Sequence, residues 1–133
     1  MTIQELALQG KHNLNNSMAS GIAGRVLDLK KEVIRESLSD FQNIEHRLEE
    51  VGKVHGITFV NDSKATNVGA AQASIEGRER PVILIAGGQS KGADMSIMFT
   101  TIKQKVKLAL LLGEDASRLQ QAWQGATRIE MVG

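Results

Sequence analysis

Two kinds of hydrophobic pattern alternate along the second half of the chain. Short apolar runs are typical of strands, and segments with an apolar residue every three or four positions are typical of helices. The pattern predicts strands at 54–60, 81–86, 108–112 and 128–132, and helices at 68–75, 96–106 and 116–123. Because strands that alternate with helices form βαβ units, we expect an α/β, Rossmann-like fold with a mostly parallel sheet and flanking helices. The continuous apolar run at 81–86 predicts a strand buried on both faces.

The first forty residues have a different, helical pattern. Apolar side chains recur every four positions from residue 14 to residue 26, and a second apolar face extends over 29–40. Asn13 or Asn15 could cap the first helix, and residues 1–11 are expected to form a strand with no obvious partner. A helical segment therefore precedes the α/β segment, and we place the division at 1–41 and 42–133.

Small residues and turn residues add detail to these elements. Gly21 and Gly24 each cost about 1 kcal/mol inside a helix, so their presence predicts close packing against another element. His55-Gly56 is a candidate hairpin turn within the strand at 54–60. The last predicted strand ends without a helix to cover it, and we therefore expect both ends of the chain to have been cut from something larger.

The loop at residues 61–67 carries the most varied chemistry in the chain. It holds a carboxylate (Asp62), an ammonium group (Lys64), two hydroxyls (Ser63 and Thr66) and two amides (Asn61 and Asn67). Ligands of α/β proteins collect at the carboxyl ends of the strands, which is where this loop begins. The next helix would turn its positive end toward an anion, with Thr66 or Asn67 as its N-cap. The loop is therefore predicted to be half of a phosphate and carboxylate site.

A second loop, at 87–94, is predicted to reach the same edge of the sheet. Gly87 and Gly88 would let backbone N–H groups approach a ligand, and Lys91 would add a second positive charge beside Lys64. Such a pocket suits a substrate with two carboxylates, or with a carboxylate next to a phosphate. Each feature alone also has a structural explanation: the glycines as a turn, Lys91 as a solvated surface charge and Asp62-Ser63 as a turn pair.

Composition excludes several other classes of protein. The 133 residues suffice for one domain with a core, and 41% of them are hydrophobic. A net charge of +1 does not favour nucleic acid or a membrane surface, and no apolar run approaches the roughly 20 residues of a membrane span. The chain has no cysteine, which suits the cytoplasm. Its three histidines, His12, His46 and His55, lie far apart, so no metal site is predicted.

Four motifs together resemble the Mur ligase family, and within it the ligases that add D-glutamate. They are His12-Asn13-x-x-Asn16, His46-Arg47, the string from Asn61 to Asn67, and Gly87-Gly88-x-x-Lys91-Gly92-Ala93-Asp94. The resemblance implies a larger protein with three domains. Residues 1–41 would be the helical end of its central ATP-binding domain. Residues 42–133 would be most of its C-terminal Rossmann-like ligase domain, truncated at the end. The ATP-binding P-loop and a modified lysine that helps to hold Mg²⁺ would lie outside this chain.

The resemblance also implies a reaction in the cytoplasm. ATP would phosphorylate the terminal carboxylate of UDP-N-acetylmuramoyl-L-alanine, and D-glutamate would attack the acyl phosphate, giving an amide of a peptidoglycan precursor. The cofactors would be ATP and Mg²⁺, with the magnesium ligands mostly outside this chain. The resemblance leaves the oligomeric state open, and the fragment alone is expected to be inactive.

The site residues follow from the same resemblance, position by position. The adenine side would be contacted by Asn13 and Asn16, with His12 beside them. The ribose and phosphates would be contacted by Arg47 and Asp62. Lys64 would be the catalytic residue near the transferred phosphoryl group, and the D-glutamate carboxylates would be held by Thr66, Lys91 and Asn67. Two alternatives stay open: a non-catalytic α/β ligand-binding module, and a ligase of the same superfamily for a different amino acid.

Overall fold

The computed structural model describes residues 2–8, 11–42, 44–89 and 92–133, and only the backbone at Lys11 and His12. The chain divides into two compact units, Met1–Glu49 and Glu50–Gly133. The division predicted between residues 41 and 42 falls in the segment that connects the last helix of the first unit to the first strand.

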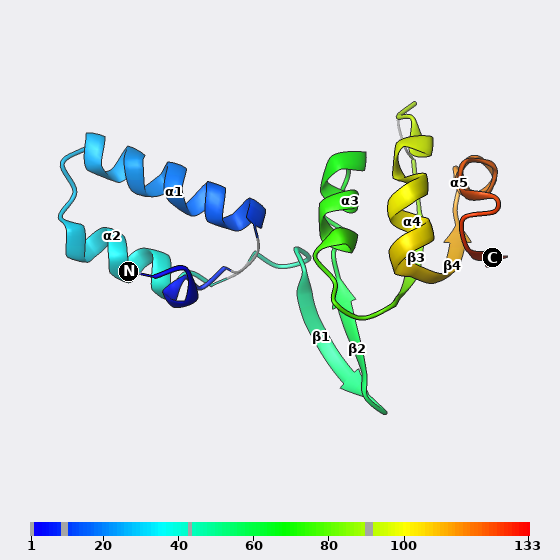
Figure 1. Cartoon of the computed structure of the whole chain (residues 1–133), viewed down its shortest axis with the longest axis horizontal. Coiled ribbons are helices and arrows are strands. Elements are labelled where there is room, and N and C mark those ends of the chain that lie inside the picture. Colours follow the sequence, from blue (N-terminus) through cyan, green and yellow to red (C-terminus); the bar gives the residue numbers. More distant parts are fainter. Residues whose placement is uncertain (1, 9–10, 43, 90–91) are drawn as a thin grey trace. The chain divides into compact units, whose positions relative to one another are not determined.

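The first unit consists of a short 3₁₀ helix, η1 (Ile3–Glu5), and two α-helices, α1 (Lys11–Val26) and α2 (Lys31–Ser39) (Figure 1). The strand expected within residues 1–11 is wrong for the described part, because Glu5 accepts the backbone N–H of Thr2 and the chain turns there. Asn13 and Asn15 do not cap α1, since the helix begins at Lys11 and both residues lie inside it.

The two helices of this unit meet through the glycines of α1. The α-carbons of Gly21 and Gly24 face Ile34 and Leu38 of α2, and a methyl group added at Gly24 would lie 3.0 Å from the Ile34 side chain. The close packing predicted from these glycines is thus confirmed at Gly24, whereas a methyl group added at Gly21 would lie at an ordinary contact distance of 3.9 Å from its neighbours. Most of the apolar stripe of α1 is exposed to solvent, however. Its members Met18, Ile22 and Val26 are 57%, 64% and 76% exposed.

The second unit begins with a hairpin of two strands, β1 (Glu49–Val54) and β2 (Ile57–Asn61). His55 and Gly56 both have positive φ angles, 49° and 80°, as a two-residue type I′ turn requires. The predicted hairpin is therefore confirmed. The four-stranded parallel sheet is not, because β1 and β2 pair only with each other in the described structure and form a separate ribbon (Figure 1).

The main sheet has three parallel strands in the order β3 (Val82–Gly87), β4 (Val106–Leu112) and β5 (Arg128–Met131). The helices of this unit are α3 (Val68–Glu76), the 3₁₀ helix η2 (Met95–Met98), which runs directly into α4 (Phe99–Lys105), and α5 (Ala116–Trp123). This arrangement confirms the predicted α/β class. The buried core comprises Ile75, Met98, Ile102, Val106, Ala109, Leu111, Ala116, Leu119 and Trp123.

The helices cover only one face of this sheet. Val82, Leu84 and Ala86 of β3 pack against the core, whereas Ile83 and Ile85 are 54% and 67% exposed. The prediction that this strand is buried on both faces is therefore wrong. The physical reason is that the two crossovers run in the same direction along the sheet, so their right-handed connections place α4 and α5 on the same side.

Candidate functional site

The loop from Asn61 to Asn67 connects β2 to α3, as predicted, and hydrogen bonds within the loop fix its shape. The Asn61 Oδ1 accepts the backbone N–H of Ser63 at 3.1 Å, and the Asp62 carbonyl accepts that of Ala65 at 2.8 Å. The Thr66 N–H donates to the Lys64 carbonyl at 2.9 Å. Three successive turns of this kind leave the backbone little freedom, which suits a loop that must present side chains in fixed positions.

The loop ends in a capped helix. The Asn67 Oδ1 accepts the backbone N–H of Ala70 at 2.9 Å, so Asn67, one of the two predicted candidates, is the N-cap of α3, and Thr66 is not. Asparagine is a preferred residue at this position because its side chain is short and its oxygen reaches an N–H that has no partner within the helix. The Asn67 side chain therefore stabilises the start of α3, in addition to any ligand that it contacts.

Asp62 is tied to the same helix from the other end of the loop. The Ser74 hydroxyl donates to the Asp62 Oδ2, and it also lies 3.0 Å from the Ala70 carbonyl. Both side chains are half-buried. Sequence reasoning missed this contact. The available signal was a lone hydroxyl two turns after the cap, on an otherwise alanine-rich helix.

Lys64 and Thr66 of the loop are exposed. An exposed ammonium group and a hydroxyl, followed directly by the N-terminus of α3, can together receive an anionic group. The structure thus gathers four of the predicted site residues, Asp62, Lys64, Thr66 and Asn67, in one ordered loop.

The glycines of the second loop have a structural explanation. A methyl group at Gly87 would lie 1.9 Å from the Leu112 carbonyl oxygen, so β3 and β4 can approach this closely only with glycine there. Gly88 has a φ angle of 98°, and its carbonyl accepts the Asp115 N–H at 3.1 Å. The loops after β3 and β4 are therefore joined at the backbone. Lys91 lies outside the described residues.

Side chains also join these two loops. The Gln89 Nε2 donates to Glu114 at 2.6 Å, and the Arg118 guanidinium lies 3.4 Å from both Asp115 and the Ala93 carbonyl. A shallow pocket beside Arg118 is lined by Ala93, Asp94, Met95, Arg118, Gln121 and Ala122. The side chain and backbone of Ser96 both donate to Asp94, which lowers the pKa of that carboxyl group.

The remaining predicted residues belong to the first unit. His12, Asn13 and Asn16 lie at the start of α1, where a spacing of three or four residues puts side chains on one face. Asn13 is half-buried and Asn16 is exposed, and the His12 side chain lies outside the described atoms.

The backbone around Arg47 is unusual. Arg47 is exposed, and it stands between two residues with positive φ angles, His46 at 64° and Leu48 at 49°. The Glu49 carboxylate accepts the His46 N–H at 2.8 Å and so holds this turn. Left-handed backbone is uncommon and costly at a leucine, and residues held in this conformation cluster at turns and at functional sites. No sequence signal marks such a conformation, since neither histidine nor leucine requires it.

Two kinds of feature are absent from the described residues. No three His, Cys, Asp or Glu side chains within them gather in a way that could hold a metal ion. None of the helices in this part of the chain combines the length and the apolar character needed to cross a membrane.

Comparison with known proteins gives concordant results. The family model "Mur ligase, glutamate ligase domain" matches residues 46–132. Two curated relatives are named UDP-N-acetylmuramoylalanine–D-glutamate ligase. The one from Salinibacter ruber is 45% identical over 91% of this chain and 26% of its own length. The one from Desulfitobacterium hafniense is 46% identical over 90% of this chain and 26% of its own length.

A solved structure has a similar fold. MurF from Acinetobacter baumannii matches with a TM-score of 0.71 over 95% of this chain and 29% of that chain, at 16% identity. The chain thus spans about a quarter of the length of the curated relatives it matches.

Proposed function

Because this chain belongs to the Mur ligase family, we propose that it is part of an ATP-dependent amide ligase that joins D-glutamate to UDP-N-acetylmuramoyl-L-alanine. The observation that carries the proposal is the identity of 45–46% to relatives named for this reaction, over about nine tenths of the chain. The ordered loop at 61–67 supports it, since it offers cationic and hydroxyl groups suited to phosphate and carboxylate ligands. Such a ligase works on nucleotide-linked precursors in the cytoplasm, where we place this protein.

The proposed reaction has two steps. The terminal carboxylate of the precursor attacks the γ-phosphorus of ATP, so a carboxyl O–P bond forms, the β–γ bridging bond breaks, and ADP leaves. The amine of D-glutamate then attacks the acyl carbon. The resulting tetrahedral intermediate expels phosphate, and the amine loses a proton as the amide forms. Both steps depend on positioning the reactants and on neutralising negative charge.

Residues of the second unit fit the part of this reaction that involves anions. Lys64, exposed on the ordered loop, would neutralise charge on the transferred phosphoryl group. Thr66 would donate a hydrogen bond to a D-glutamate carboxylate, with Lys91 and Asn67 as further contacts. The Asn67 Oδ1 already caps α3, so its contribution to substrate would come through the helix that it orders as well as through its amide. Asp62 would face the nucleotide.

Residues of the first unit would serve the nucleotide. Asn13 and Asn16, a helical turn apart on α1, would contact the adenine side, with His12 adjacent in sequence. Arg47 would contact the ribose or phosphates. The positive φ angles on both sides of Arg47 support this assignment, because residues with costly backbone conformations cluster at ligand-binding sites.

The residues present fit a phosphate ligand better than they fit a magnesium ion. Among the described residues, Asp62 is held by Ser74 and no group of three potential metal ligands exists. The described residues therefore do not form a complete Mg²⁺ site by themselves. The proposal places most magnesium ligands in the rest of the ligase.

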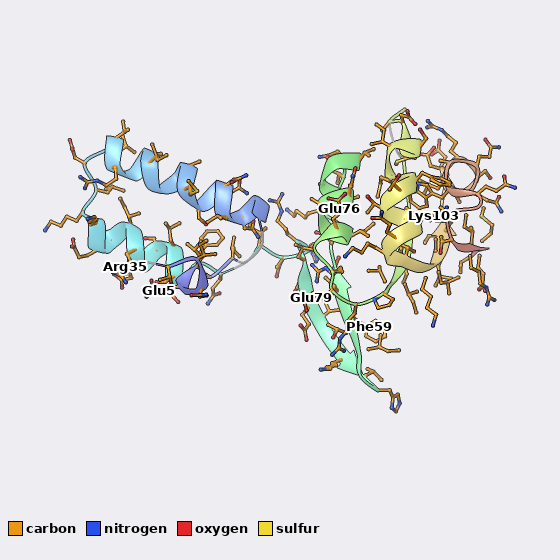
Figure 2. All side chains as sticks on the ribbon, in the orientation of Figure 1. Glu5, Arg35, Phe59, Glu76, Glu79 and Lys103 are labelled. Carbon is orange, nitrogen blue, oxygen red and sulfur yellow. The ribbon has the colours of Figure 1, made fainter. Side chains whose placement is uncertain are left out.

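The test is phosphate release by the complete protein encoded around this sequence. Release is expected only when ATP, UDP-N-acetylmuramoyl-L-alanine and D-glutamate are all present. Lys64→Ala should lower kcat/KM by about a hundredfold, since it removes charge stabilisation from the transition state. Lys103→Ala is the matched control, because Lys103 is an exposed lysine on α4 outside the loop (Figure 2). The 133-residue chain alone should release no phosphate.

Different results would support the alternatives. Release with another amino acid but not with D-glutamate would identify a different ligase of the superfamily. No ATP-dependent release by the complete protein would favour a non-catalytic binding module. Equal losses of activity in Lys64→Ala and Lys103→Ala would contradict the assignment of Lys64.

A further inference from the structure

The contact between Asp62 and Ser74 joins the candidate loop to the last turn of α3. The two residues are twelve positions apart, and both are half-buried. The Ser74 hydroxyl has two possible acceptors, the Asp62 carboxylate and the Ala70 carbonyl. A hydroxyl has one proton, and a charged carboxylate accepts it more strongly than a backbone carbonyl does. The loop contact is therefore the stronger of the two.

Ser74 stands on a well-anchored part of the helix. The next residue, Ile75, is 5% exposed and belongs to the core. Glu76, labelled in Figure 2, accepts the Thr101 hydroxyl of α4 at 3.0 Å. The Arg78 Nε donates to the Ser74 carbonyl at 3.1 Å, and Lys105 Nζ donates to the Arg78 carbonyl at 2.9 Å. Ser74 thus connects the loop to a segment that is fixed against the core and α4.

The loop is consequently held at two points. Asn67 fixes its end at the N-terminus of α3, and Asp62 fixes its beginning two turns further along the same helix. Lys64 and Thr66 lie between these points and are exposed. A segment fixed at both ends loses less conformational entropy when a ligand binds, so a contact of this kind raises affinity without touching the ligand.

We propose that Ser74 is a positioning residue: its hydroxyl holds Asp62 so that the loop at 61–67 has its binding shape before nucleotide arrives. The role in nucleotide binding rests on the function proposed above. The role in ordering the loop does not, because it follows from the hydrogen bonds of this chain alone. The two parts can therefore be tested separately.

The first test is amide hydrogen exchange, measured by NMR on this chain without ligand. Ser74→Ala should speed exchange at the hydrogen-bonded loop amides of Ser63, Ala65 and Thr66 by about tenfold, because a hydrogen bond to a charged group is lost. Ser74→Thr keeps the hydroxyl and should restore slow exchange. Gln72→Ala is the matched control: it removes the 2.7 Å bond from Gln72 to Glu76 on the same helix and leaves the loop untouched.

Two exchange results would overturn the proposal. One is unchanged loop exchange in Ser74→Ala, and the other is an equal increase in Gln72→Ala, which would indicate a general loosening of α3. Alanine is a good helix former, so loss of the whole helix is not expected in either variant.

The second test is steady-state kinetics of the complete ligase. Ser74→Ala should raise the KM for ATP about fivefold while kcat changes less than about twofold, and Ser74→Thr should restore KM. An inactive wild type would refute the proposed function. The hydrogen-exchange result would then still show whether Ser74 orders the loop. An active wild type with the same KM for ATP in Ser74→Ala would refute the positioning of Asp62 for nucleotide and leave the proposed function intact.

Discussion

The two units of this chain are stabilised in different ways. In the second unit, nine buried residues form one core between the sheet and its helices. In the described part of the first unit, Leu6 is the only large apolar side chain that is buried, and α1 and α2 meet over two glycines. The first unit contains two helices with many exposed apolar side chains, among them Ile22 and Val26.

This difference shows how unevenly stability is distributed along one sequence. Apolar burial is the dominant favourable term in folding, and it scales with the area removed from water. The second unit therefore has most of what it needs to fold by itself. The helices of the first unit bury little, and helices of nine to sixteen residues are marginal without tertiary packing. Three experiments test this difference between the units.

The largest expected effect comes from the core. Leu111→Ala removes a side chain that is 0% exposed and should lower the free energy of unfolding of the second unit by about 3 kcal/mol. Urea unfolding followed by the fluorescence of Trp123 measures it, because Trp123 is the only tryptophan and is buried in this unit. The matched change in the first unit, Leu38→Ala, should cost less than about 1 kcal/mol, since Leu38 is only half-buried, and far-ultraviolet circular dichroism of the helices measures this cost. Equal costs would contradict the contrast between the units.

Glycine-to-alanine substitutions should change stability in opposite directions in the two units. Gly87→Ala forces a methyl group against the Leu112 carbonyl and should destabilise the second unit by about 2 kcal/mol. Gly21→Ala has room, with Ile34 and Leu38 at 3.9 Å, and should stabilise α1 by about 0.5 to 1 kcal/mol through helix propensity. Thermal unfolding of the Gly87→Ala variant can be followed by Trp123 fluorescence, and that of the Gly21→Ala variant by far-ultraviolet circular dichroism. A rise in the melting temperature of Gly87→Ala would show that the strands do not approach as described.

The smallest effect is a dependence on pH. In the second unit, hydrogen bonds from Gln72 and Thr101 lower the pKa of Glu76. In the first unit, the hydrogen bond from the Thr2 N–H lowers the pKa of Glu5, and the charge of Arg35 lowers it further. A carboxyl group with a lowered pKa in the folded state stabilises the protein above its ordinary pKa, and that contribution is lost as pH falls through the lowered value. The urea midpoint of the second unit should therefore decrease slightly between about pH 6 and about pH 3, and less so in Glu76→Gln.

A control for this titration lies close by. Glu79 is an exposed carboxylate that follows α3 (Figure 2). Glu79→Gln should leave the pH dependence as it is in the wild type. If Glu79→Gln flattens the dependence as much as Glu76→Gln does, the effect would reflect overall charge and not the hydrogen bonds to Glu76.

Elements with a clear period could be predicted from the sequence. The helix expected at 116–123 has those bounds, and the strand expected at 81–86 is Val82–Gly87. The hairpin at His55-Gly56 and the N-cap at Asn67 were also predicted, because turns and caps depend on residues close in sequence. Strand pairing, in contrast, could not be predicted from the hydrophobic pattern. The apolar pattern of β2 does not say which strand it joins, and the pattern of β3 does not say that one face lacks a cover.

Some features of the candidate site could likewise be predicted from the sequence, and others could not. The residue types of the loop identified Asp62, Lys64 and Thr66 as candidates, and these residues are close together because they are neighbours in the sequence. The contact of Ser74 with Asp62 depends on how the loop turns back along α3, which composition cannot give. The positive φ angles beside Arg47 depend on the path of the chain between the second helix and the first strand.

The uncovered face of the three-stranded sheet has a practical consequence for anyone who handles this chain. Ile83, Ile85 and Leu112 leave apolar surface in water in the folded state. Dyes that fluoresce in apolar surroundings bind exposed hydrophobic surface of this kind. A dye-based melting assay would thus start from a high signal, and the intrinsic fluorescence of Trp123, on the covered side, is the better reporter of unfolding.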